Sequence, residues 1–172
     1  MALTRIDPQA FTGGSVFIEG SGYAGALKSF EPPKIEFETI EANSSIGKQE
    51  IVLPTLKPLN AKVSFQAVNK MIFSLLKKGK LQKIVVKANA SSSGETGAIT
   101  DTAVHATMEG NIKSAEPPKF EMSKELEISV EMSVSKYTYA VGGEEMVNYD
   151  IFTATCKLVG EDQFTNIRNN IS

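Results

Sequence analysis

The chain has 172 residues, with 18 basic and 20 acidic side chains and a formal net charge of −2. This length suits one domain with a buried core, and the charge balance excludes bulk basicity of the kind that holds nucleic acid. The single cysteine, Cys156, excludes an intramolecular disulfide framework and a multi-cysteine metal site.

Residues 1–14 are expected to form an N-terminal extension to a single domain that takes in residues 1–172. The opening residues lack a basic region followed by an apolar stretch, so we expect no secretory signal. No apolar run approaches the roughly 20 residues that a spanning helix needs, so we expect no membrane anchoring. These features favour a soluble protein that is made in a cytoplasm.

The first regular element is predicted in SVFIEGSGYAGALKSF, residues 15–30, which is typical of a β-hairpin with a turn at Gly20, Ser21 and Gly22. A Glu-Pro-Pro-Lys corner follows at residues 31–34 and recurs at residues 116–119. Proline cannot donate a hydrogen bond to a β-ladder, so each corner is expected to be a stiff joint at the entry to a strand. The surrounding residues do not keep repeating, which favours coincidence or similar edge geometry over a duplication.

The middle of the chain alternates loops, strands and one helix. Residues 41–50, EANSSIGKQE, suit a mobile connection that reaches out of the domain. A strand is predicted at residues 60–67. Residues 67–79 then predict an amphipathic helix with Gly79 just beyond its end. The apolar face of this helix comprises Val68, Met71, Ile72, Leu75 and Leu76.

Further strands are predicted at residues 81–90, 102–114 and 125–139, and residues 89–101 are expected to be a flexible hairpin tip. The clearest alternation is ELEISVEMSVSKYTY, residues 125–139, which has an apolar row and an acidic-polar row. A second helix is predicted near the start of residues 160–172. Together these elements predict a mainly β fold, an antiparallel sandwich or partly open barrel, with one flanking helix and a short C-terminal helix.

Catalytic chemistry has little support in the sequence. The only histidine, His105, is expected on the polar face of a strand, and Cys156 is expected to be a small core residue. The glycines of residues 20–25 lack the helix that follows a phosphate-binding loop. The carboxylates of residues 125–131 have no opposing ligand cluster, so a solvated stripe is favoured over a metal site. We therefore predict no enzyme activity, no cofactor and no metal.

The order of elements resembles the major tail tube protein of contractile-tailed bacteriophages, the FII family, which also serves related contractile bacteriocins. The resemblance begins in VFIEGSGYAGALKSFEPPKI, residues 16–35, and resumes in YDIFTATCKLVGEDQFTNIRNNIS, residues 149–172. The middle of the chain matches by layout. The C-terminal residues that match the family pattern are Asp150, Gly160, Asp162, Phe164, Arg168, Asn170 and Ile171.

This resemblance implies a structural subunit that forms hexameric rings, stacked into a hollow tube through which DNA passes into the host without sequence-specific binding. It also implies partners in the tail sheath, the baseplate or tube initiator, and the tail terminator. The expected location is the tube of a virion tail, assembled in the host bacterial cytoplasm. The loop that resembles the ring-stacking loop comprises Asn43, Ser44, Ser45, Ile46, Gly47 and Lys48.

The lumen of such a tube would be lined by a polar sheet face, where acidic side chains would repel DNA phosphates. An outer, solvated face is an equally weighted interpretation of the same residues. The candidate lumen residues are Glu36, Glu38, Glu125, Glu127 and Glu131.

Two other functions remain open from the sequence. A tube protein of a contractile bacteriocin or secretion system would share the fold and the ring. A monomeric ligand-binding β-barrel would instead enclose an apolar pocket and would need no pairing between copies.

Overall fold

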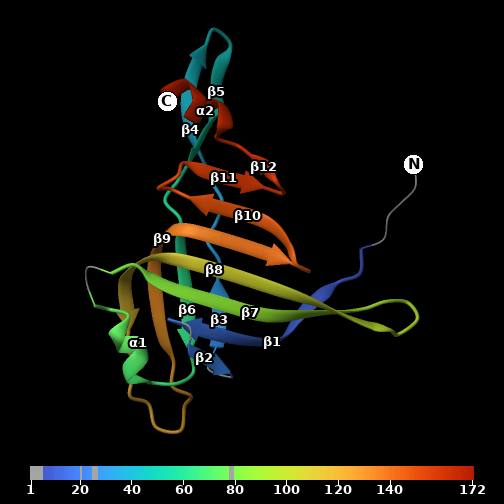
Figure 1. Cartoon of the computed structure of the whole chain (residues 1–172), viewed down its shortest axis with the longest axis vertical. Coiled ribbons are helices and arrows are strands. Elements are labelled where there is room, and N and C mark those ends of the chain that lie inside the picture. The colour runs from blue at the N-terminus through green and yellow to red at the C-terminus, as the bar shows by residue number, and fades with distance from the viewer. Residues whose placement is uncertain (1–5, 20, 25–26, 78–79) are drawn as a thin grey trace.

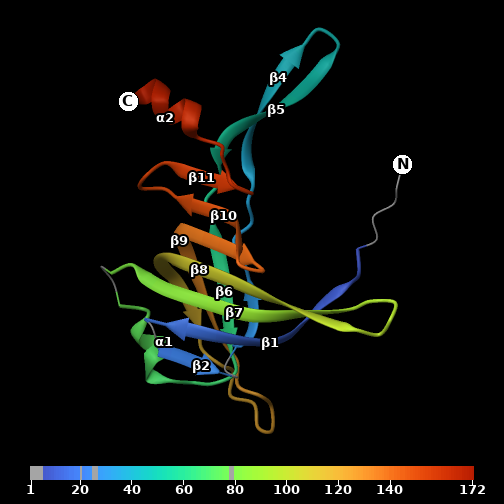
Figure 2. The ribbon, with the colours of Figure 1, turned by 45° about the vertical axis from the view of Figure 1, so that its right-hand side comes forward.

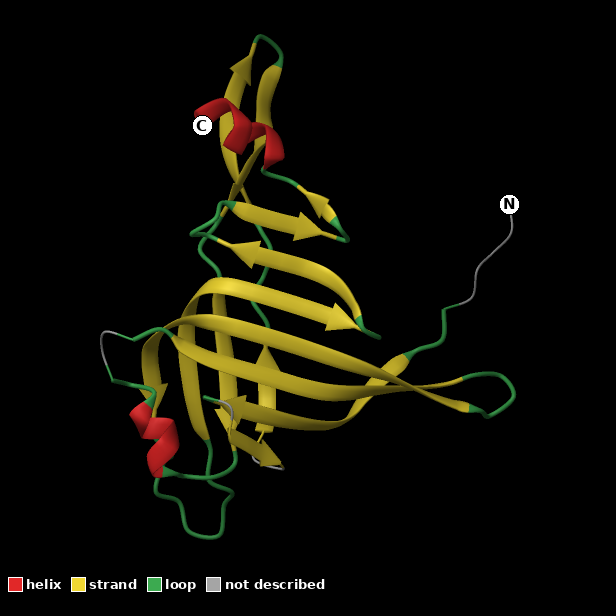
Figure 3. Ribbon diagram, in the orientation of Figure 1, coloured by secondary structure: helices red, strands yellow, loops and turns green. Residues whose placement is uncertain are grey.

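The computed structural model describes residues 6–19, 21–24, 27–77 and 80–172, and it is dominated by antiparallel strands (Figures 1 and 3). The elements in chain order are β1 (Gln9–Ile18), β2 (Ser21–Ala24), β3 (Leu27–Glu31), β4 (Phe37–Ser44), β5 (Gly47–Leu56), β6 (Asn60–Phe65), α1 (Lys70–Ser74), β7 (Gln82–Ser93), β8 (Ile99–Glu116), β9 (Ile128–Val141), β10 (Glu144–Asp150), β11 (Thr155–Leu158), β12 (Glu161–Asp162) and α2 (Thr165–Ile171). The predicted mainly β class with a flanking helix and a short C-terminal helix is confirmed.

Ten of the strands form one sheet, which runs in the order β12-β11-β10-β9-β8-β7-β1-β2. β6 also pairs with β9, and β3 pairs with β6, so the sheet branches at β9. The first half of β9 pairs with β6 and the second half with β10, while β8 runs along its other side. Within the described residues this sheet is not closed into a barrel, because its end strands β12 and β2 do not pair with each other. β4 and β5 form a separate two-stranded sheet.

The bend in the sheet lies where β8 carries register shifts between Glu109 and Gly110 and between Ile112 and Ser114. Bulges of this kind bend a strand and increase its twist. A Cβ atom on Gly110 would lie only 2.0 Å from the carbonyl oxygen of Ser133 on β9. Glycine is therefore required at this position, because it allows the two backbones to approach closely.

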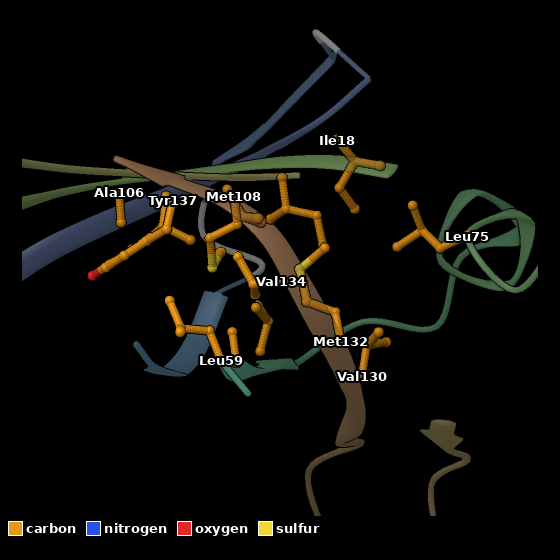
Figure 4. Close-up of a cluster of buried hydrophobic side chains, with 14 of the residues drawn as sticks. Ile18, Leu59, Leu75, Ala106, Met108, Val130, Met132, Val134 and Tyr137 are labelled. Atoms are coloured by element: carbon orange, nitrogen blue, oxygen red, sulfur yellow. The ribbon is translucent and has the colours of Figure 1, made fainter. Parts of the chain in front are cut away.

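The core lies between the two halves of the bent sheet and is closed on one side by α1 (Figure 4). The apolar row predicted for residues 125–139 is confirmed from Ile128 onward, since alternate residues of β9 are buried. These buried residues are Ile128, Val130, Met132 and Val134. Val16, Ile84 and Met108, from β1, β7 and β8, are fully buried in the same core.

The predicted helix at residues 67–79 is shorter in the structure, where α1 spans Lys70–Ser74. Its start is fixed by the side chain of Asn69, which accepts a hydrogen bond from the backbone N–H of Met71 at 3.1 Å. Ile72 and Leu75 are buried as predicted, but Val68 precedes the cap and is exposed. The predicted C-terminal Gly79 lies outside the described residues.

The strand predicted at residues 125–139 also begins later than expected. Glu125, Leu126 and Glu127 precede β9 in the connection from β8. Both proline corners follow directly after a strand, because β3 ends at Glu31 and β8 ends at Glu116. The corners therefore lie beside a strand as predicted, but the expected position at a strand entry is wrong, because β4 begins only at Phe37 and β9 only at Ile128.

Two predicted connections are also refined. β7 and β8 extend well into the expected tip at residues 89–101, which leaves only residues 94–98 between them. β1 and β2 form the predicted hairpin, with Ile18 opposite Ser21. The predicted turn is wrong at Ser21 and Gly22, which lie in β2, and its first residue, Gly20, lies outside the described residues.

Candidate assembly surfaces

The four strands β3, β6, β9 and the end of β8 carry a continuous polar face opposite the core. The register places Ser29, Ser64, Ser129 and Glu116 in one row, and Glu31, Lys62, Glu131 and Ser114 in the next row. We call this surface the polar sheet face. It consists of Ser29, Glu31, Asn60, Lys62, Ser64, Asn111, Lys113, Ser114, Glu116, Ser129, Glu131 and Ser133.

Lysines accompany the acidic side chains of this face and its border. Nζ of Lys113 lies 3.3 Å from a carboxylate oxygen of Glu131 and 3.2 Å from Oδ1 of Asn60. At the border, Lys28 donates to Glu127 at 2.6 Å, and this contact holds the pKa of the Glu127 carboxyl below its usual range. The surface is therefore hydrophilic, and lysines lie beside its acidic residues.

The five predicted lumen residues fall into two groups. Glu131 lies on the polar sheet face, and Glu127 and Glu125 lie just before β9, where they border a polar cavity of about 330 Å³ together with Lys62. Their expected place on one strand is wrong, because strand pairing starts only at Ile128.

The other two lie toward the β4–β5 hairpin. Glu36 precedes β4 and accepts hydrogen bonds from Lys34 and Lys57, which lower the pKa of its carboxyl to about 2. Glu38 lies on β4 and accepts a hydrogen bond from the hydroxyl of Thr55 at 2.8 Å.

The polar sheet face has an open edge on each side. β3 pairs with β6 alone, and residues 111–116 of β8 pair with β9 alone, because β7 begins at Gln82 opposite Gly110. Within the part of the chain that the structure describes, no strand covers the outer side of either segment. Open edges present unpaired backbone N–H and C=O groups that can pair with another chain.

The strands β4 and β5 project from the body of the molecule as a two-stranded hairpin (Figures 1 and 2). The predicted stacking residues lie at its far end, with only Ser45 and Ile46 outside the two strands. The expected mobile connection at residues 41–50 is thus mostly regular β-structure. The hydroxyl of Ser44 donates to the carbonyl of Gly47 at 2.9 Å and closes the turn, and the side chain of Ile46 is 97% exposed.

The C-terminal residues that match the family pattern form a clasp. Arg168 on α2 donates to a carboxylate oxygen of Asp162 at 2.7 Å and to the backbone carbonyl of Ala154 at 2.9 Å. The other carboxylate oxygen of Asp162 accepts from the backbone N–H of Phe164 at 3.0 Å. The contact with Arg168 is the main cause that lowers the pKa of Asp162 to about 2. The clasp therefore ties α2 to the turn between β10 and β11.

The remaining residues of this pattern have local roles. Gly160 has a φ of +83° in the turn before β12, where glycine is favoured. Phe164 packs against the core, and Asp150 accepts from the backbone N–H of Phe152 at 2.9 Å. Asn170 is exposed on α2.

Reactive side chains are not brought together in the described residues. His105 is exposed on β8, and Cys156 is fully buried, which raises the pKa of its thiol. Within the described ranges no three His, Cys, Asp or Glu residues are grouped to hold a metal ion. Among the helices that the structure describes, none is long and apolar enough to cross a membrane.

The fold is similar to those of solved components of contractile injection systems. The chain is similar to the sheath/tube terminator of the extracellular contractile injection system PVC in its extended state, with 12% identity, a TM-score of 0.55, and coverage of 81% of this chain and 99% of that chain. It is also similar to a chain of the PVC sheath-tube complex in its extended state, with 12% identity and a TM-score of 0.51. That alignment covers 74% of this chain and 88% of the other chain. The similarity to the tube terminating cap of the anti-feeding prophage has 16% identity and a TM-score of 0.50. It covers 81% of this chain and 94% of the other chain.

The family follows from the sequence itself. The model of phage tail tube protein FII matches residues 8–171, so the chain belongs to this family of tail tube proteins. It is a structural component of a phage or contractile tail tube, as the resemblance implied. A comparison with curated proteins found no match.

Proposed function

We propose that six copies of the chain form a ring, and that rings stack into a hollow tube with the polar sheet face toward the lumen. The observation that carries this proposal is the pair of open edges that flank this face. Pairing of β3 in one copy with residues 111–116 of β8 in the next would continue the sheet around the ring. Such a head-to-tail contact closes by rotation and leaves surfaces free for stacking above and below.

The chemistry of the polar sheet face suits a conduit. Its serine and asparagine side chains are hydrophilic, and lysines lie beside its glutamates, so it offers no concentrated basic patch to hold phosphates. DNA would pass along this face without sequence-specific contacts. We propose Glu131, Glu127 and Glu125 as residues at or near the lumen, with Glu36 and Glu38 toward the next ring.

The partners follow from the family and the similar structures. We propose that the outer surface of the tube contacts a tail sheath, and that its ends contact a baseplate or tube initiator and a tail terminator. The assembled tube would then be part of a virion tail, after assembly in the host bacterial cytoplasm. A tube of a related bacteriocin or secretion system is the second candidate, because the chain shares its fold with parts of injection systems.

A monomeric ligand-binding barrel has less support. Its interior would be a closed apolar pocket, whereas this sheet is open. One apolar hollow, between Phe11, Phe30 and Tyr139, has a volume of about 90 Å³, below the roughly 300 Å³ usual for ligand sites. The hollow of about 360 Å³ between Phe11, Leu27 and Val86 is open to solvent and does not form a closed pocket.

The test is negative-stain electron microscopy together with mass measurement of the purified chain over a range of concentrations, alone and with baseplates added. Rings with six subunits, single or stacked, are the expected result. A chain that stays monomeric under both conditions would refute the ring proposal and would favour the ligand-binding barrel.

A further inference from the structure

The hairpin β4–β5 lacks a covering partner in the monomer. Its strands pair only with each other among the described residues, and an isolated two-stranded hairpin is marginally stable in water. Ile40, Ile46 and Val52 are nonetheless 49%, 97% and 64% exposed. With about 3.4 Å per residue, the eight residues of β4 extend roughly 27 Å, far enough to reach into a neighbouring molecule.

The hairpin is also acidic. Glu41 and Glu50 lie directly opposite each other in the ladder, an arrangement of like charges that destabilises a strand pair. Lys48 contacts Glu41 at 3.1 Å and is the only lysine among three carboxylates in residues 37–56. Glu50 and Glu41 would therefore be stabilised by cationic groups from outside the hairpin.

A surface of the opposite sign and similar apolar character lies around α1. Phe73, Leu76 and Leu81 are 40–42% exposed, and the first two are next in sequence to the buried Ile72 and Leu75. Residues 67–81 contain no acidic residue. Lys70 and Lys77 form no ion pair with any described residue, whereas Lys80 contacts Glu19 at 3.0 Å. We call this the helix surface. It consists of Val68, Lys70, Phe73, Leu76, Lys77 and Leu81.

The two surfaces lie toward opposite ends of the long axis of the molecule (Figures 1 and 2). Copies that are stacked in the same direction would thus bring the hairpin of one onto the helix surface of the next. This is a head-to-tail contact between two different surfaces, which propagates along an axis.

We propose that the occupant of the helix surface is the β4–β5 hairpin of a second copy in the adjacent ring. Ile46 and Ile40 would cover Phe73 and Leu76, and Lys70 and Lys77 would face Glu41 and Glu50. The inference rests on the proposed ring assembly and adds the acceptor surface for the stacking contact. Because two pairs of opposite charges meet, stacking should weaken as the salt concentration rises.

The first experiment reverses the charges. K70E/K77E should lower the yield of sedimenting tubes by about tenfold or more while leaving rings intact, because like charges would meet across the contact. E41K/E50K in the same chain should restore the tubes. The matched control E144K/E145K, at the start of β10, changes two exposed charges away from both surfaces and should leave tube yield unchanged. Tubes that form normally from K70E/K77E would overturn the inference.

The second experiment is a cross-link, which is practical because the one native cysteine, Cys156, is buried. Oxidation of the variant I46C/F73C should give a ladder of covalent multimers, and oxidation of I46C/I99C should not. Intact rings without a ladder would overturn the inference and leave the ring proposal standing. Absence of rings from wild-type chain, with and without baseplates, would overturn the ring proposal itself.

Discussion

Gly110 offers a stringent test of how the sheet is bent. An alanine Cβ at this position would lie 2.0 Å from the oxygen and 2.9 Å from the carbon of the Ser133 carbonyl. Contacts of Cβ atoms below 3.0 Å are essentially never seen, so β8 and β9 would have to move apart by about 1 Å. The obstacle is backbone in the middle of a ladder and cannot rotate away.

The cost of G110A follows from this geometry. Inserting a methyl group into a packed site costs about 1–3 kcal/mol, and an immovable backbone neighbour places the expected loss near 3 kcal/mol. For a chain of this size, 1 kcal/mol corresponds to about 2–4 °C, so the melting temperature should fall by about 6–12 °C.

The assay compares thermal and urea unfolding of G110A with those of G13A. Gly13 lies on β1 of the same sheet, and a Cβ there would meet nothing within 4 Å. G13A should change the free energy of unfolding by less than about 1 kcal/mol. If G110A proves as stable as G13A, the close approach at the bend is not what requires glycine.

Three further predictions concern the corner, the clasp and the thiol. P32A/P33A should loosen ring assembly, because β3 is an open edge strand that ends at this corner. An intact, normally stable tube from this variant would count against a structural role for the corner. The pKa of Asp162 is lowered from 3.8 to about 2 in the folded state. The ionised carboxylate therefore adds to the free energy of unfolding above pH 4, and this stabilisation is lost as the pH falls toward 2. The difference in melting temperature between wild type and D162N should accordingly shrink as the pH is lowered from about 4 to about 2. A difference that stays constant would contradict a stabilising role for the ionised Asp162. Cys156 should react with a thiol reagent only after unfolding, because its side chain is fully buried; rapid reaction of the native chain would be inconsistent with this packing.

Sequence patterns predicted the strands well where a strand has one buried face. The alternation from Ile128 to Val134 is visible in the sequence because each buried residue faces the same core. The same alternation extends toward the N-terminus through Leu126 to Glu125, yet β9 begins only at Ile128. The reason is that both partner strands of β9 end at this point. β6 ends at Phe65, which pairs with Ile128, and β8 ends at Glu116, which pairs with Ser129. Strand ends depend on partners that are distant in the sequence.

The assembly surfaces were only partly predictable, for the same reason. The lysines that neutralise Glu127 and Glu131 are Lys28 and Lys113, which are 99 and 18 residues away along the chain. Residues 41–50 resemble a loop in sequence because both faces of the hairpin are exposed there, so its strands show no alternating buried row. The basic helix surface could have been noticed from the lysines of residues 67–81, which have no acidic residue among them.

The most direct test of the tube proposal is a cryo-electron microscopy reconstruction of the assembly formed by the purified chain, with baseplates added if needed. The predicted result is stacked six-subunit rings in which β3 pairs with the end of β8 of the neighbouring copy and Lys62 and Glu131 face the lumen. A reconstruction that places the polar sheet face on the outer wall, or joins the subunits without the two open edges, would contradict it.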